Sequence, residues 1–324
     1  MGPPRRKLII DTDPGIDDAM AILMAFQSPE VEVIGLTTVF GNVPTPIATT
    51  NALYLCALAD CPEVPVAEGA WAPLTKSEPT RISDYAHGED GFGNTHVANP
   101  GFVKAEKVDQ SACDFLIEKV AQHPGEVTVV ALGPLTNLAL AVRKDPSFVK
   151  NVKELCILGG AFFASGNVNP AAEFNIYSDP DAADIVFTAG MNTRVIGINL
   201  TTQVILNDKE LTDIKDSGTK YGKYVHDITR FYMYWHVTSD GVDGIFLHDP
   251  TCMAAVLDPS LVTYRTGVVR VETQGICAGL TLLDMGLKGW NSSNLWMHQP
   301  PIKVGWTVEA NRVKELVKNL LTKP

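Results

Sequence analysis

The chain has 324 residues, of which 45% are apolar and 19% charged, and its formal net charge is −11. This composition allows a large core, and the length suits one large α/β domain, so we expect a single domain over residues 1–324. The negative charge argues against nucleic acid or an acidic membrane surface as partner. The sequence has no apolar run of roughly 18 residues and no signal-peptide pattern. We therefore expect a cytoplasmic protein.

Short apolar, β-branched runs alternate with helical patterns along most of the chain. Helical patterns occupy, for example, residues 17–28 and 134–144, each directly after a predicted strand. This alternation predicts an α/β fold with a mostly parallel central sheet and helices on both faces, an open sheet like the Rossmann fold. Residues 261–273 and 301–310 alternate like antiparallel strands, which predicts a small antiparallel C-terminal extension. The predicted parallel strands cover residues 7–10, 31–39, 126–132, 152–158 and 193–199.

Residues 70–105 are rich in Gly, Pro, His and Asp and have no clear period. A stretch of this length without periodicity is typical of a long functional loop. Within it, His87 lies among glycines that would permit a mobile lid. The aromatic-rich residues 221–235 are expected to form a helix, in which Trp235 faces either the core or a pocket.

Four aspartates follow the first predicted strand, in the stretch "DTDPGIDD". In a parallel sheet, ligands bind beyond the carboxyl ends of the strands, so this position matters most. Asp11, Asp13, Asp17 and Asp18 would repel one another unless they are paired or bound to a cation, and carboxylates suit Ca²⁺ or Mg²⁺. An EF-hand is excluded because the twelfth loop position is not Glu. As an alternative, Asp17 and Asp18 serve only the positive end of the following helix.

Two later stretches carry polar side chains of suitable chemistry. In "IFLHDPT", His248 can act as a general acid, although Asp249 followed by proline also fits an ordinary helix start. In "SGNVNPAAEFNIYSDP", Asn167, Glu173 and Asn175 offer donors and acceptors to the vicinal hydroxyls of a sugar.

Together these stretches resemble the inosine-uridine-preferring nucleoside hydrolase family, and within it the plant members. The family signature DxDxGxDD is present at residues 11–18, and "TTVFGN", "ALGPLTNLA", "ILGGAF", "AEFN" and "HDP" follow in family order. The resemblance runs from about residue 7 to residue 258. It implies hydrolysis of the N-glycosidic bond of ribonucleosides such as uridine, inosine or xanthosine. It also implies a homo-oligomer, with a dimer favoured over a tetramer.

The resemblance further implies a bound Ca²⁺ and a role for each site residue. A water activated at the ion and deprotonated by Asp13 would attack the anomeric carbon, and His248 would protonate the leaving base. Asp11 would orient the ligands from behind. The ligands of the ion would be Asp13, Asp18, Asp249 and the backbone carbonyl of Leu132. The ribose would be held by Asp17, Asn42, Asn167, Glu173 and Asn175. The base would contact His87, Tyr232, His236 and Asp240.

Two other classes share part of this pattern. Phosphatases of the haloacid dehalogenase type use Mg²⁺ and place DxD after a first strand, which Asp11-Thr12-Asp13 fits. Those enzymes usually continue with Gly-Thr or Val-Thr, and this chain lacks their late acidic pair. The second class is a nonenzymatic Ca²⁺ or nucleoside sensor on the same scaffold, against which the retained Asp13 and His248 argue. The preferred base stays open, because well-known relatives carry Tyr at the position of His236.

Overall fold

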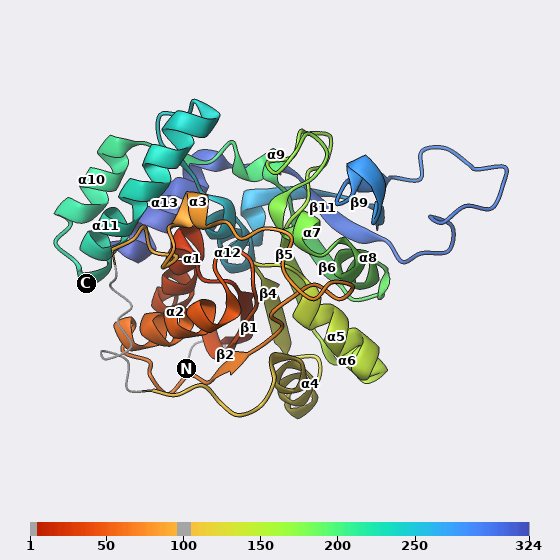
Figure 1. Ribbon diagram of the computed structural model, residues 1–324, viewed down its shortest axis with the longest axis horizontal. Helices are drawn as coiled ribbons and strands as arrows, with labels where there is room; N and C mark the ends of the chain where they lie inside the picture. The colour runs from red at the N-terminus through yellow and green to blue at the C-terminus, as the bar shows by residue number, and fades with distance from the viewer. Residues whose placement is uncertain (1–4, 96–104, 324) are drawn as a thin grey trace.

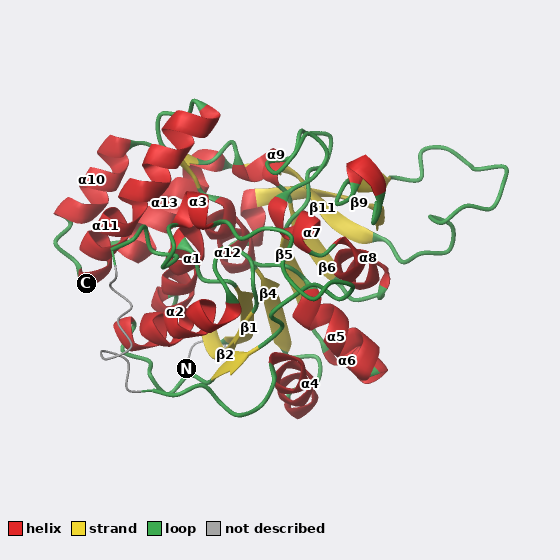
Figure 2. Ribbon diagram, in the orientation of Figure 1, coloured by secondary structure: helices red, strands yellow, loops and turns green. Residues whose placement is uncertain are grey.

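The computed structural model describes residues 5–95 and 105–323. These residues form one large mixed sheet with helices packed around it (Figures 1 and 2). The strand order is β10-β9-β11-β6-β5-β4-β1-β2-β3. Each pair of neighbours in the row β11-β6-β5-β4-β1-β2-β3 is parallel. β9 pairs antiparallel with both β11 and β10. The strands are β1 Arg6–Thr12, β2 Val31–Thr38, β3 Val66–Glu68, β4 Val127–Ala131, β5 Glu154–Leu158, β6 Thr193–Ile196, β9 Val262–Val271, β10 Thr281–Asp284 and β11 Ile302–Val308.

Helices cover both faces of the sheet, and the side chains of β1 show why. Leu8 and Ile10 point into one apolar cluster and Ile9 into the other, as the two-residue period of a strand requires. All three are fully buried, which explains why β1 reads as an unbroken apolar run. The first cluster includes α1 Ile16–Gln27, α2 Thr45–Leu58, α11 Lys220–Trp235, α12 His248–Leu257 and α13 Ala310–Leu321. The second includes α4 Ala112–Gln122, α5 Thr136–Lys144, α6 Pro146–Asn151 and α8 Pro180–Thr188.

The order of the parallel strands determines where a site can form. From β1 the chain moves outward to β2 and β3 and then returns to β4 on the other side of β1. The sheet therefore has a topological switch point between β1 and β4, and a crevice opens at such a point beyond the carboxyl ends of the strands. The aspartate stretch begins at Asp11, near the carboxyl end of β1, and continues into α1, so its carboxylates lie at this crevice.

These observations confirm the predicted α/β fold with its mostly parallel sheet and antiparallel C-terminal strands. The antiparallel strands continue the main sheet, because Lys303 and Val304 of β11 pair in parallel with β6. The short pair β7 (Ile205–Leu206) and β8 (Ile245–Phe246) was not predicted, since two residues carry no period. In the predicted loop, residues 70–95 contain only the short helix α3 (Asp84–His87), and residues 96–104 lie outside the described residues.

The single domain predicted for residues 1–324 stays a prediction. Across the described residues, no helix is both long and apolar enough to cross a membrane.

Candidate active site

The turn between β1 and α1 is closed by the side chain of Asp18. One carboxylate oxygen of Asp18 accepts a hydrogen bond from the amide of Gly15 at 3.0 Å, and the other accepts from the hydroxyl of Thr12. Asp18 therefore does serve the start of helix α1, as in the alternative in which Asp17 and Asp18 act only at the helix end. At Gly15 a Cβ atom would lie 2.5 Å from Nδ1 of His87, so only glycine fits here. The signature thus folds back on itself and brings its carboxylates together.

The side chain of Asp11 accepts hydrogen bonds from one residue of β2 and one residue of α5. One of its oxygens accepts from the hydroxyl of Thr37 at 2.5 Å and from the side-chain amide of Asn137 at 2.8 Å. The other oxygen has no hydrogen-bond partner within the described residues. Burial raises the pKa of Asp11 to about 6. Asp11 therefore lies where the sequence predicted a bracing residue, with Asn137 as a support that the sequence analysis missed.

Asp13 presents an unpaired oxygen in a fully buried position. Its Oδ2 atom accepts from the backbone amide of Asn42 at 2.7 Å, whereas Oδ1 has no hydrogen-bond partner among the described residues. At Gly133 a Cβ atom would lie 2.6 Å from Oδ1, so the glycine after β4 leaves room for this carboxylate. An unpaired buried carboxylate oxygen is costly unless a cation binds it.

Three further carboxylates converge beside Asp13. Oxygens of Asp17, Asp18 and Asp249 all lie within 4.8 Å of one another. Burial and mutual repulsion raise the pKa values of Asp13 and Asp249 well above the usual range and that of Asp17 to about 7. A group of buried carboxylates with raised pKa values fits a hard divalent cation. The family resemblance implies Asp13, Asp18 and Asp249 as metal ligands and Asp17 as a ribose contact, and the structure also brings Asp17 within 4.8 Å of Asp18 and Asp249.

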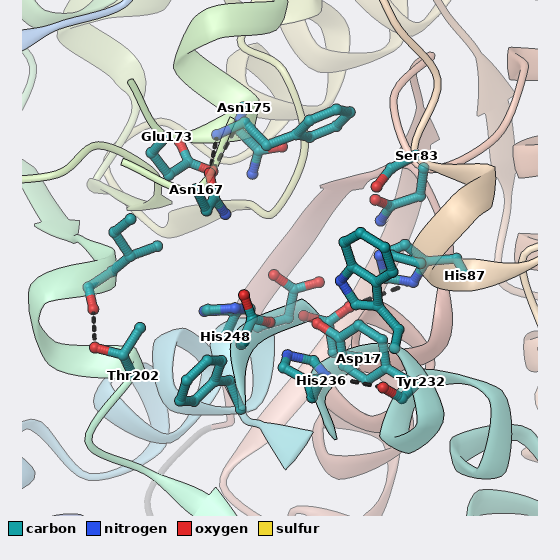
Figure 3. Close-up of a pocket in the computed structure, with 18 of the residues that line it drawn as sticks. Asp17, Ser83, His87, Asn167, Glu173, Asn175, Thr202, Tyr232, His236 and His248 are labelled. Carbon is teal, nitrogen blue, oxygen red and sulfur yellow. Dashed lines mark hydrogen bonds and ion pairs between the residues drawn. The ribbon is translucent and has the colours of Figure 1, made fainter. Parts of the chain in front are cut away.

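A cavity of about 290 Å³ opens above the carboxylates (Figure 3). It is lined by most of the predicted site residues, which come from distant parts of the chain. Asp11, Asp13 and Asp18 do not line it and are fully buried next to it. The predicted residues on the cavity wall are Asp17, Asn42, His87, Leu132, Asn167, Glu173, Asn175, Tyr232, His236, Asp240, His248 and Asp249.

One wall of the cavity carries the three residues predicted to hold ribose, Asn167, Glu173 and Asn175 (Figure 3). Glu173 begins the short helix α7 (Phe174–Ser178), and its carboxylate accepts from the amides of Gly160, Asn175 and Ile176 at 2.8 to 3.1 Å. The side-chain amide of Asn175 donates to the carbonyl of Leu132 at 2.5 Å. These contacts keep the polar groups in place and leave a second lone pair on that carbonyl.

The opposite wall consists of aromatic and histidine rings. The ring centroids of His87 and Tyr232 are 5.0 Å apart, and those of Tyr232 and His236 are 4.2 Å apart. Nδ1 of His87 accepts from the amide of Ile16 at 3.1 Å, so the predicted lid histidine is buried and held to α1. His236 begins a π-helix (His236–Asp240), a local distortion frequent at functional sites.

Burial favours the neutral form of both His236 and His248. Nδ1 of His236 lies 2.9 Å from the carbonyl of Tyr232, which can only accept, so the hydrogen of the neutral ring is on Nδ1. Burial lowers the pKa of His236, and it lowers that of His248 to about 3. His248 was predicted as the acid that protonates the leaving base. That role stays a prediction; the lowered pKa favours the neutral ring, which can donate a hydrogen bond to the base.

Several pocket residues were not predicted. Tyr85 and Trp235 line the cavity with ring centroids 4.9 Å apart, and both also pack against the first apolar cluster, so Trp235 contacts the pocket and the core together. Thr201 contacts His248 from outside the cavity, with its hydroxyl 2.6 Å from Nδ1. The motif "GPLTNLA" contains Asn137, but its spacing gives no sign of the contact with Asp11.

Comparison with known proteins identifies the family. The family model described as inosine-uridine preferring nucleoside hydrolase matches residues 8–315. The chain belongs to this family. The hydrolase is 58% identical over 318 residues to Uridine nucleosidase 1 of Arabidopsis thaliana, covering 98% of this chain and 94% of the relative. It is 37% identical over 281 residues to the inosine-uridine preferring nucleoside hydrolase of Leishmania major, covering 86% of this chain and 88% of the relative.

Solved structures agree with this placement. A plant nucleoside hydrolase is 52% identical, with a TM-score of 0.96 over 99% of this chain and 100% of that one. A purine-preferring ribonucleoside hydrolase from Gardnerella vaginalis is 34% identical, with a TM-score of 0.90 over 98% of each chain. The chain is therefore an enzyme, a nucleoside hydrolase. Neither the phosphatase nor the nonenzymatic sensor describes it.

Proposed function

We propose that this nucleoside hydrolase cleaves uridine to uracil and ribose, accepts inosine and xanthosine as further substrates, and uses Ca²⁺ as its cofactor. The observation that carries the proposal is the unpaired Oδ1 atom of Asp13 among buried carboxylates, directly below a cavity of about 290 Å³. Uridine is favoured because the relatives named uridine nucleosidase in Arabidopsis thaliana and Oryza sativa are 58% and 56% identical to it. Six free cysteines suit the reducing cytoplasm that we expect for it.

The residues at the bottom of the cavity fit a hard divalent cation. Asp13, Asp18 and Asp249 would hold it together with the carbonyl of Leu132, and Asp17 lies close enough to contribute. The donors are all oxygen atoms, which favours Ca²⁺ over Zn²⁺. When bound, such a cation neutralises the carboxylates, orients hydroxyl groups of the sugar and makes water more acidic.

The surrounding side chains can perform the remaining chemistry. Asp13 is the base, because its unpaired oxygen can accept a proton from the attacking water. Asp17, Asn42 and the ribose wall bind the hydroxyl groups, and the nearby carboxylates stabilise the positive charge that develops on the sugar ring. The cavity wall encloses the reacting bond and limits access of bulk water.

The leaving base would lie among the rings of the opposite wall. Tyr232 and His87 provide stacking surface, and the buried His236 and the exposed Asp240 also line the cavity. We infer that the hydroxyl of Thr201 donates to Nδ1 of His248, so that the neutral ring keeps its hydrogen on Nε2. His248 then donates a hydrogen bond to the departing base, which leaves as an anion and afterwards takes a proton from water, while Asp13 returns its proton to the solvent.

A substrate and metal panel tests this function. We expect the purified protein to release ribose from uridine with the highest kcat/KM, and from inosine and xanthosine at lower rates. Dialysis against a chelator should abolish activity, and Ca²⁺ should restore it better than Zn²⁺. Asp13→Asn should be inactive, whereas Asp216→Asn, a change at an exposed aspartate of α10 (Asp208–Asp216), should retain activity. Full activity after chelation, or in Asp13→Asn, would contradict the proposal.

A further inference from the structure

The loop of residues 88–94, "GEDGFGN", follows the short helix α3 directly and folds back on itself. The side chain of Asp90 accepts from the backbone amides of Phe92 and Asn94, both at 2.8 Å. The ring of Phe92 is fully buried and lies edge-on to the ring of Tyr224 in α11, with centroids 6.0 Å apart. The loop is therefore packed onto the body of the protein in spite of its three glycines.

One side chain of α2 joins this loop to the turn between β1 and α1. Asn51 is 1% exposed, and its Nδ2 atom donates to the carbonyl of Pro14 and to the carbonyl of Asp90, both at 2.9 Å. A side-chain amide has two N–H donors, so these two hydrogen bonds use both of them. Pro14 lies in the aspartate turn and Asp90 in the loop. Asn51 therefore holds together two segments that are distant in the sequence.

The loop approaches Asn51 as closely as a backbone can. At Gly91 a Cβ atom would lie 2.7 Å from Nδ2 of Asn51 and 2.9 Å from the carbonyl oxygen of Pro14. The φ angle of Gly91 is +77°, in the region that favours glycine. A larger residue at this position would push the loop away from the turn.

His87 depends on the same junction between loop and turn. Its Nδ1 atom accepts from the amide of Ile16, just after the turn, while its own carbonyl accepts from the amide of Gly93 in the loop at 2.8 Å. Its ring lies beside that of Tyr232 on the cavity wall (Figure 3). A hydrogen bond to a ring nitrogen requires a fixed position of both partners. A shift of the loop relative to the turn would therefore move His87 on the cavity wall.

The carboxylates of the turn have supports of their own. Asp18 accepts from the amide of Gly15 and from the hydroxyl of Thr12. It also accepts from the side-chain amide of Asn42 at 2.8 Å. These contacts do not involve Asn51. Loss of the Asn51 amide should therefore release the loop and its histidine but leave the carboxylates in place.

We propose that Asn51 is a positioning residue that holds His87 on the base-binding wall by joining its loop to the aspartate turn. Asn51 does not line the cavity, so it acts through His87. The inference rests on the proposed contact between His87 and the leaving base. It assigns Asn51 to the binding of the base and not to the binding of the sugar.

A double-variant cycle with Asn51→Leu and His87→Ala tests the proposal. Leucine has a similar shape to asparagine but no N–H donor. Each single change should raise the KM of the nucleoside that the enzyme cleaves best about 10-fold, the size of a lost ring contact. The double variant should have no higher KM than His87→Ala alone, because two residues that act as one unit are not additive. The inhibition constant of free ribose, which has no base, should stay unchanged.

Two further variants keep the test decisive. Gly91→Ala displaces the loop while Asn51 is still present, so it should also raise the KM and leave ribose binding unchanged. The control is Thr49→Val, because Thr49 is a buried residue of the same helix whose hydroxyl contacts Thr38 and Thr45. This variant should lower the melting temperature and leave the KM of the nucleoside unchanged.

Three results would overturn the proposal. Additive effects of Asn51→Leu and His87→Ala would show that the two residues act separately. An equal rise in the KM of the nucleoside and in the inhibition constant of ribose would indicate a general disturbance of the site. An effect of His87→Ala without one of Asn51→Leu would overturn this inference alone. An unchanged KM in His87→Ala would instead overturn the proposed position of the base, and this inference with it.

Discussion

The hydroxyl of Thr201 lies 2.6 Å from Nδ1 of His248, although the two residues belong to different helices. Thr201 is fully buried at the end of α9 (Ile198–Thr201) and does not line the cavity, whereas His248 begins α12 and does. The hydrogen bond fixes the orientation of the imidazole ring. Thr201 is therefore a positioning residue for His248, for which we propose the contact with the leaving base.

Thr201→Val should remove this orientation while preserving the shape of the side chain. We expect kcat for uridine to fall about 10- to 100-fold with little change in KM, because the base then leaves without a well-placed donor. A riboside with a good leaving group, such as p-nitrophenyl riboside, should lose much less activity. Thr201→Ser should restore the rate. Equal losses on both substrates would indicate a purely structural role for Thr201.

Asp13→Asn should have opposite effects on activity and on the stability of the metal-free protein. The substitution removes the proposed base and one cation ligand, so we expect kcat to fall at least about 100-fold. It also removes one of several repelling buried charges, so the melting temperature in chelator should rise. The increase in melting temperature that Ca²⁺ gives the wild type should largely disappear. Thermal scans with and without Ca²⁺ measure both effects, and an undiminished response to Ca²⁺ would contradict the assignment.

The metal-free protein should lose stability as the pH rises from about 4 to 7. The pKa is about 6 for Asp11 and about 7 for Asp17 in the fold, against 3.8 for a free aspartate. Between these values the buried carboxyl groups of the folded state, with Asp13 and Asp249 among them, bind protons that the unfolded chain has already released. The lowered pKa of buried histidines such as His248 acts in the opposite direction, but the carboxyl groups outnumber the histidines, so the free energy of unfolding falls as the pH rises. Urea unfolding in chelator at several pH values measures the trend. Saturating Ca²⁺ should reverse it, because the cation competes with protons. A free energy of unfolding in chelator that rises over this range would contradict the prediction.

Asn137→Ala should weaken cation binding but leave kcat at saturating Ca²⁺ largely unchanged. The side-chain amide of Asn137 donates to Asp11 at 2.8 Å and to the carbonyl of Thr38 at 2.9 Å, and its oxygen accepts from the amide of Ala70. Loss of a supporting hydrogen bond behind metal ligands typically costs about 10- to 100-fold in affinity. Calcium titration of activity should show this shift, with kcat largely recovered at saturation. Asn192→Ala, at an exposed asparagine, is the matched control.

Much of the fold was predictable because it follows from local periodicity. The unbroken apolar run of β1 predicts a strand covered on both faces, and in the structure Leu8 and Ile10 point to one face and Ile9 to the other. The position of the aspartates after the first strand was also predictive, since parallel strands bring their carboxyl ends to one edge. Short elements such as β7 and β8, with two residues each, have no period from which to predict them.

The amino-acid sequence by itself determined the sheet, the aspartate signature and the family, because these depend on patterns within short segments. The tertiary structure decided which distant residues meet: Asn137 is 126 positions from Asp11, and Thr201 is 47 positions from His248. It also decided that the pKa of His248 is lowered and that of Asp17 is raised, because burial disfavours the charged form of both side chains. Burial and long-range contact are properties of the packed chain, and no local spacing encodes them.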